Sequence, residues 1–145
     1  MTCSYRESDV ITTVNLENDE QGKSYSVVAD MAKNRLYITI SEVKLTKKNL
    51  DNLYTDIRFY VADLKPDFDV ITDVSACTLG ALNGLPTFNK ITDFLVDNKV
   101  GKVIRVVDEQ KVLFKQFLNI TAKMQGYSAR YVNSLAEAEE ELNKP

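Results

Sequence analysis

Two stretches of alternating apolar and polar residues open the patterned part of the chain. Apolar residues recur at every second position over 25–29 and again over 36–40, with a short break between them. A period of two is typical of a half-buried β-strand, and two such runs joined by a short turn are typical of a hairpin. The positions concerned are Tyr25, Val27, Ala29, Leu36, Ile38 and Ile40. The pattern predicts a β-hairpin that begins at Ser24.

The period then changes to that of a helix. After Thr46, which is a good N-cap residue, apolar residues recur at intervals of three and four, as on one face of an α-helix. They are Leu50, Leu53, Tyr54, Ile57, Val61 and Leu64. Pro66 is expected to end this helix, and the β-rich run at 69–74 predicts a buried strand.

The rest of the chain alternates helices and strands. Pro86, which fits the first turn of a helix, marks the start of a second helix. Its apolar face comprises Phe88, Ile91 and Leu95. Beyond it we expect a strand at 102–107, a helix over 108–125, a strand at 127–133 and a short last helix. Gly126 stops the longer of these two helices, and Ser134 with Glu137 forms a capping box for the shorter one.

The order of these elements is ββαβαβαβα. Alternation of strands with helices predicts an α/β fold with a largely parallel sheet, to which the opening hairpin adds one antiparallel pair. We therefore expect a single α/β domain at 24–145, with a mixed, mostly parallel sheet of about five strands and with four helices. Residues 1–23 form a polar N-terminal segment, in which 10–14 could add an edge strand.

Composition excludes several classes of active site. The chain has 145 residues and a formal net charge of −3 at pH 7. It contains no His, which excludes Ser/His/Asp and Cys/His nucleophile pairs and His-based zinc sites. Its two cysteines, Cys3 and Cys77, lie far apart, which favours a reducing cytoplasm over a disulfide framework. We expect Cys77 to be a small buried apolar residue.

The sequence also lacks the features that are typical of several classes of partner and ligand. No basic leader with an apolar run and no stretch of about 20 apolar residues is found, so we expect a cytoplasmic protein without a membrane span. Lysines are scattered rather than gathered in a basic stripe, which argues against nucleic acid as a partner. Gly80 and Gly84 lack the Gly-Lys-Ser/Thr of a phosphate-binding loop. We therefore expect no nucleotide, metal or other cofactor.

Two groups of carboxylates could carry chemistry. Asp67, Asp69 and Asp73 surround one strand, and only Asp73 lies near its carboxyl end, where α/β sheets place their ligands. The other two are expected to be solvated turn residues. The acidic run at 137–141 is expected to be the solvated face of the last helix.

The stretch 73–85, together with the element order, resembles the STAS domain family of sulfate transporters and anti-sigma-factor antagonists, in particular its SpoIIAA-like branch. That family's pattern is a strand ending Asp-Leu-Ser, an apolar residue, and then Asp-Ser-Ser-Gly-Leu opening a helix. Asp73 and Ser75 match the end of the strand. Cys77 takes the apolar position, and Gly84 with Leu85 matches the closing pair. The likeness extends over residues 24–142.

The chain departs from the family pattern at the regulatory serine. Ala81, Leu82 and Asn83 stand where the family has Asp-Ser-Ser, so Leu82 takes the place of the serine that a partner kinase phosphorylates. Leucine cannot be phosphorylated, so the charge switch that a phosphoserine provides at a helix N-terminus is missing. Asn83 is expected to cap the following helix. The nearby hydroxyls that could take over the modification are those of Ser75, Thr78 and Thr87.

Two functional hypotheses from different classes follow. The first, implied by the resemblance, is a non-enzymatic regulatory module that binds a protein partner through 78–85 and the following helix. That partner is an anti-sigma-factor-like or other regulator, or a second copy of the chain. The second is a carrier of a small apolar, lipid-like ligand, because apolar residues replace the polar switch residues of this loop. Catalysis by Asp73 with a Lys or Tyr is the weakest alternative. The residues predicted to form the site are Asp73, Ser75, Thr78, Leu82, Asn83, Gly84 and Leu85.

Overall fold

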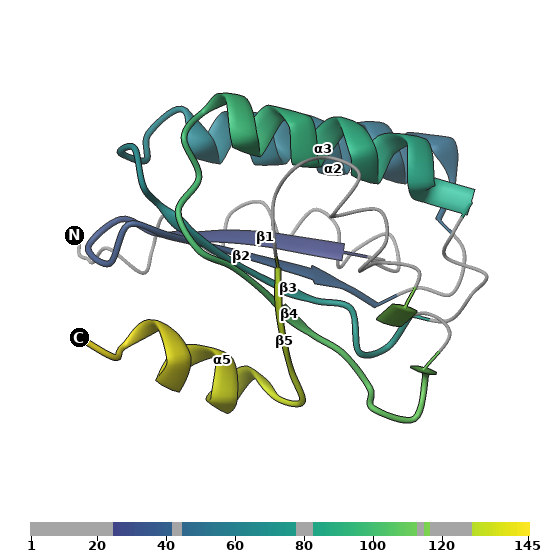
Figure 1. Cartoon of the computed structure of the whole chain (residues 1–145). Helices are drawn as coiled ribbons and strands as arrows, with labels where there is room; N and C mark the ends of the chain where they lie inside the picture. Colours follow the sequence, from purple (N-terminus) through teal and green to yellow (C-terminus); the bar gives the residue numbers. More distant parts are fainter. Residues whose placement is uncertain (1–24, 42–44, 78–82, 113–114, 117–128) are drawn as a thin grey trace.

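Antiparallel pairing joins the first two strands into the predicted hairpin, and the three later strands continue the sheet in parallel and in chain order (Figure 1). The strands are β1 (Tyr25–Asp30), β2 (Arg35–Ile40), β3 (Asp69–Asp73), β4 (Val103–Val106) and β5 (Arg130–Val132). The computed structural model describes residues 25–41, 45–77, 83–112, 115–116 and 129–145. The mixed, mostly parallel sheet expected from the sequence is confirmed.

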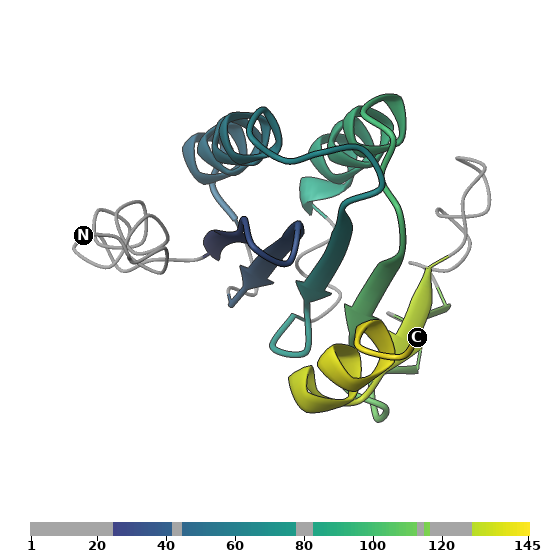
Figure 2. The same ribbon diagram turned by 90° about the vertical axis from the view of Figure 1, so that its left-hand side faces the viewer.

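Helices cover both faces of the sheet. They are α2 (Lys47–Val61), α3 (Leu85–Asp97) and α5 (Leu135–Leu142). The first two lie side by side over one face, and α5 covers the other face over β3, β4 and β5 (Figures 1 and 2). Right-handed crossovers that always step in the same direction along a sheet return on the same face, which explains the position of α2 and α3.

The main core lies between the sheet and the pair of helices α2 and α3. The alternating residues of the hairpin point into it, as predicted, and meet fully buried residues such as Leu53, Ile57 and Val70. A second, smaller core lies under α5 on the opposite face. Its buried members are Ile71, Ile104, Val106, Ala138 and Leu142.

Thr46 caps α2 as predicted, because its Oγ1 accepts a hydrogen bond from the backbone N–H of Asn49 at 3.1 Å. The helix ends earlier than Pro66. The backbone N–H groups of Asp63 and Leu64 donate to carbonyls three residues back, so the chain leaves the helix through tighter turns.

The described residues contain three helices, whereas the sequence predicted four. The segment predicted as a helix over 108–125 opens with a turn, in which Asp108 Oδ1 accepts a hydrogen bond from the backbone N–H of Gln110 at 2.9 Å, and its described residues Val112, Lys115 and Gln116 are helical. Such a contact is typical of a turn or of the start of a helix, so the helical residues begin later than the predicted start at 108. The rest of the segment at 113–114 and 117–128 lies outside the described residues.

The predicted N-terminal segment at 1–23, with its edge strand at 10–14, also lies outside the described residues. In the part of the chain that the structure describes, no helix has the length and apolar character needed to span a membrane.

Ser134 caps α5, as its spacing from Glu137 predicts. Ser134 Oγ accepts a hydrogen bond from the backbone N–H of Glu137 at 3.1 Å, and Glu137 Oε1 accepts one from the backbone N–H of Asn133 at 2.7 Å. The Ser134 half of the predicted capping box is thus formed, whereas Glu137 bonds the N–H of Asn133, one residue before the N-cap, rather than that of Ser134.

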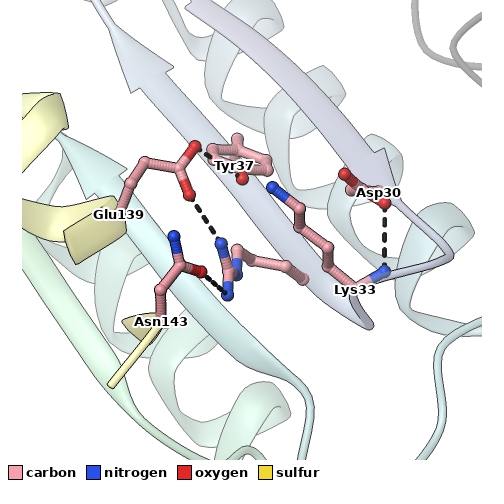
Figure 3. A network of polar contacts seen from close by, with 6 residues as sticks. Asp30, Lys33, Tyr37, Glu139 and Asn143 are labelled. Atoms are coloured by element: carbon pink, nitrogen blue, oxygen red, sulfur yellow. Dashed lines mark hydrogen bonds and ion pairs between the residues drawn. The ribbon is translucent and has the colours of Figure 1, made fainter. Parts of the chain in front are cut away.

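An ion pair between Arg35 and Glu139 joins β2 to α5. Arg35 is only 5% exposed, and its Nη1 donates to Glu139 Oε1 at 2.5 Å. Its Nη2 donates to Asn143 Oδ1 at 3.2 Å, while the Tyr37 hydroxyl donates to the other Glu139 oxygen at 2.8 Å (Figure 3). The expectation that the whole acidic run is solvated is therefore wrong, because the helix directs Glu139 toward a buried arginine of the sheet.

Hydrogen bonds and nearby charges compensate for the burial of the Arg35 cation. Burial acts to lower the pKa of Arg35, but the hydrogen bonds and charges of Tyr37 and Glu139 outweigh it and raise the pKa above its ordinary value. The pKa of Tyr37 is also raised, mainly by burial. Arg35 Nε is buried without a hydrogen-bond partner among the described residues. Loss of the Glu139 charge would therefore leave a buried cation without compensation.

We expect Glu139→Gln to lower the free energy of unfolding by about 1–3 kcal/mol, the usual effect of weakening hydrogen bonds to a charged group. Glu140→Gln is the matched control, because Glu140 is exposed in the same helix and should change stability by less than about 0.5 kcal/mol. Urea unfolding of both variants measures the difference. Equal effects of the two substitutions would contradict a structural role of the ion pair.

Candidate functional site

Asp73 ends β3, and its side chain folds back onto the turn that follows. Its Oδ1 accepts hydrogen bonds from the backbone N–H of Ser75 at 3.0 Å and from the Ser75 hydroxyl at 2.6 Å. The backbone N–H of Cys77 then donates to the Val74 carbonyl at 3.0 Å. Short polar side chains favour such turns because they can satisfy backbone groups two residues on. The carboxylate singled out by the sequence thus holds the turn.

Lys111 closes the same turn from a distant part of the chain. Its Nζ donates to the carbonyl of Ser75 at 2.9 Å and to the carbonyl of Cys77 at 2.7 Å. Sequence analysis missed this residue, since nothing in its local pattern distinguishes it from a solvated lysine. The contact arises because Lys111 follows β4, and β4 ends beside β3 at the same edge of the sheet.

Cys77 is buried, with only 1% of its surface exposed, as expected. Its Sγ donates to the carbonyl of Ile40 at 3.6 Å. Burial raises the pKa of the Cys77 thiol to about 11, with a smaller contribution from Asp73 and an opposing one from Lys111. The thiol is therefore neutral near pH 7, and it serves packing rather than nucleophilic chemistry.

The second part of the predicted site opens α3. The expectation that Asn83 caps this helix is wrong: the N-cap is Gly84, which makes no side-chain cap bond. Asn83 Nδ2 instead donates to the Leu45 carbonyl at 2.7 Å. A Cβ on Gly84 would lie 2.8 Å from Leu50 Cδ2, so the absence of a side chain lets α3 begin close to α2.

Both flanks of the candidate loop are tied to the connection between β2 and α2. Cys77 reaches Ile40 at the end of β2, and Asn83 reaches Leu45 just before α2. Of the predicted site residues, Asp73 and Ser75 are joined by hydrogen bonds, while Asn83, Gly84 and Leu85 form the start of α3. Thr78 and Leu82 lie outside the described residues.

A polar cleft of about 430 Å³ lies beside the turn, at the carboxyl ends of β4 and β5. Its wall includes Ser75, Glu109 and Asn133, and Asn133 Nδ2 donates to Glu109 Oε1 at 2.8 Å. Among the residues that the structure describes, no three His, Cys, Asp or Glu side chains are grouped so as to hold a metal ion.

The described residues enclose one small apolar cavity near the loop to which the carrier hypothesis assigns its pocket, and 78–82 of that loop lie outside the described residues. A cavity of about 70 Å³ lies between the sheet and the helices α2 and α3, next to Cys77. Sites for drug-sized ligands typically measure about 300–1,000 Å³. The cavity in this part of the chain is thus too small for a lipid-like molecule.

No protein-family model matches the chain, and no curated protein matches it. Among solved structures, it is similar to an anti-sigma factor antagonist from Mycobacterium paratuberculosis. The two share 17% sequence identity, and the likeness covers 83% of this chain and 96% of that chain, with a TM-score of 0.54. The fold is that of an anti-sigma factor antagonist. This is the STAS, SpoIIAA-like fold that the resemblance in 73–85 predicted.

The raised pKa of Cys77 predicts a loss of stability in base. The unfolded chain ionises its thiol near the ordinary value of 9.0, whereas the folded chain does so at about 11. The contribution of the protonated Cys77 thiol to the free energy of unfolding is therefore complete below about pH 9 and is lost as the pH rises toward 11. In a Cys3→Ser background, the free energy of unfolding should fall by about 2 kcal/mol more over this range than in the further variant Cys77→Ala.

Urea unfolding between pH 8 and pH 11 measures this difference, and the Cys77→Ala variant controls for the tyrosines and lysines that titrate over the same range. Parallel pH profiles of the two proteins would contradict a raised pKa of the Cys77 thiol.

Proposed function

We propose that this protein is a non-enzymatic, cytoplasmic interaction module that binds a regulatory protein partner through 78–85 and α3. The observation that carries the proposal is the similarity in fold to a protein described as an anti-sigma factor antagonist, over 83% of this chain. The resemblance of 73–85 to the SpoIIAA-like pattern supports the location of the surface. Partner binding is proposed to need no phosphoserine, since Leu82 stands at that position.

The contacts around the loop support a role in binding rather than in catalysis. Lys111 and Cys77 are committed to backbone carbonyls, and the Asp73 carboxylate is committed to the turn. These bonds hold the flanks of the loop in one conformation, while Ala76 and Pro86 are exposed beside it. A surface that is ordered before binding loses less conformational entropy when a partner docks.

Ser75 is a poor replacement for the missing phosphoserine. Its hydroxyl donates to the Asp73 carboxylate at 2.6 Å, so a phosphate there would place two anionic groups against each other and break the turn. Thr87 lies in the first turn of α3, where a phosphate would be favoured by the helix dipole. Dependence of binding on Thr87 phosphorylation is therefore the alternative outcome that the test must distinguish.

We expect Ala76→Arg to abolish capture of the partner, because Ala76 is exposed directly beside the proposed surface and a long charged side chain there would obstruct docking. Ala32→Arg is the matched control, since Ala32 is equally exposed in the β1–β2 turn at the opposite end of the sheet. The measurement is quantitative mass spectrometry of proteins retained from a native lysate by the tagged wild type and by both variants. Both variants should unfold within about 0.5 kcal/mol of the wild type.

A partner retained equally by Ala76→Arg and Ala32→Arg would contradict the proposed surface. Thr87→Ala and phosphatase treatment should leave capture unchanged. Loss of capture in either case would contradict independence from phosphorylation while leaving the surface supported.

A further inference from the structure

β1 forms one edge of the sheet, because among the described strands it pairs with β2 alone. In an antiparallel pair every second residue directs its N–H and C=O toward the neighbouring strand, so the alternate residues of β1 direct theirs away from β2. Six consecutive residues of β1 pair with β2 in one continuous register, without a bulge. β1 therefore presents a regular row of donors and acceptors to a further strand.

The two edges of the sheet differ in how they are protected. β5 has only three residues and begins with the exposed Arg130, which pairs with Glu141 at 3.2 Å. Short strands and charged side chains are the usual protection against pairing with another chain. β1 is twice as long, contains no Lys, Arg or Pro, and carries its one charge, Asp30, at its last position. The remaining way to protect such an edge is to cover it with another segment.

α2 places an exposed aromatic ring near this edge. The hydroxyl of Tyr25, the first residue of β1, donates to Asp56 Oδ2 at 2.7 Å, so the Asp56 side of the helix lies over β1. Phe59 follows Asp56 by three residues, which makes the two neighbours on the helix surface, and it is 64% exposed. A segment added along β1 would lie close to Phe59 and reduce its exposed apolar surface.

The chain carries a segment suited to this edge directly before β1, outside the described residues. Positions 10–14 read Val-Ile-Thr-Thr-Val, five uncharged β-branched residues of the type enriched in strands. The ten residues at 15–24 connect them to Tyr25, and they include Asn18 and Gly22, which are typical of turns. A connection of this length allows 10–14 to return along β1 in the antiparallel direction.

We propose that 10–14 pairs with β1 as a further antiparallel strand and thereby prevents other chains from pairing at this edge. α2 lies between the edge and α3 (Figure 2), so the site is separate from the surface proposed to bind a regulatory partner. Failure of this proposal would leave the proposed partner surface intact.

Amide hydrogen exchange of the full chain, followed by NMR, tests the pairing. We expect protection of all the β1 amides, including those that point away from β2, at every protein concentration. Contacts between the α-protons of 10–14 and those of β1 should accompany it. Protection of alternate β1 amides only, or absence of these contacts, would overturn the proposal. Protection of the outward amides that appears only as a dimer forms in sedimentation velocity would overturn it in favour of a second copy of the chain.

Proline substitutions provide a second test. Thr12→Pro and Thr13→Pro remove adjacent N–H groups, one of which must point toward β1 in a paired strand. At least one of them should lower the protection of the outward β1 amides by about tenfold or more and produce concentration-dependent dimers. Asn18→Pro, in the connection, is the matched control and should do neither. Equal effects of all three substitutions, or unchanged protection in both threonine variants, would overturn the proposal.

Discussion

Parallel pairing of β2, β3, β4 and β5 is the constraint on which the rest of this structure depends. A parallel neighbour cannot be reached through a tight turn, so each step along the sheet needs a crossover, and right-handed crossovers place α2 and α3 over the same face. The carboxyl ends of these strands consequently share one edge. Asp73, Asp108 and Asn133, which end or follow three different strands, are brought to that edge by the pairing alone.

Side chains at this edge mainly satisfy backbone carbonyls. Lys111 donates to two of them, and Cys77 and Asn83 to one each. A buried carbonyl without a hydrogen-bond donor costs about 1–3 kcal/mol. These contacts therefore stabilise the turns, whose carbonyl groups have no donor within the strands. Because the Lys111 ammonium and the neutral Cys77 thiol both donate to backbone carbonyls, they hold these turns in place rather than act as reactive groups. A surface held in one shape loses less conformational entropy on binding, which agrees with the proposed interaction role.

On the opposite face of the sheet, α5 is held by a small apolar contact and by an ion pair. Only Ala138 and Leu142 of α5 are buried, and an eight-residue helix has little stability of its own. The ion pair of Arg35 with Glu139 supplements this small apolar contact. The acidic run that the sequence suggests is a solvated face is therefore divided by the helix: Glu139 pairs with Arg35 of the sheet, Glu141 pairs with Arg130 and Lys144, and Glu140 is exposed.

Local signals predicted most of the elements, but they placed the start of one expected helix at 108, where Asp108 instead forms a turn with Gln110. At the candidate site, the resemblance located the turn but assigned Asn83 a cap that it does not form. The sequence by itself determined the strands, the Thr46 cap, the fold class and the place of the turn, because these depend on periodicity and on neighbours within about four residues. Only the tertiary structure decided which carbonyls Lys111 reaches, that Glu139 pairs with the buried Arg35, and how small the cavity is. These depend on contacts between residues 34 to 104 positions apart in the sequence, which no local pattern records.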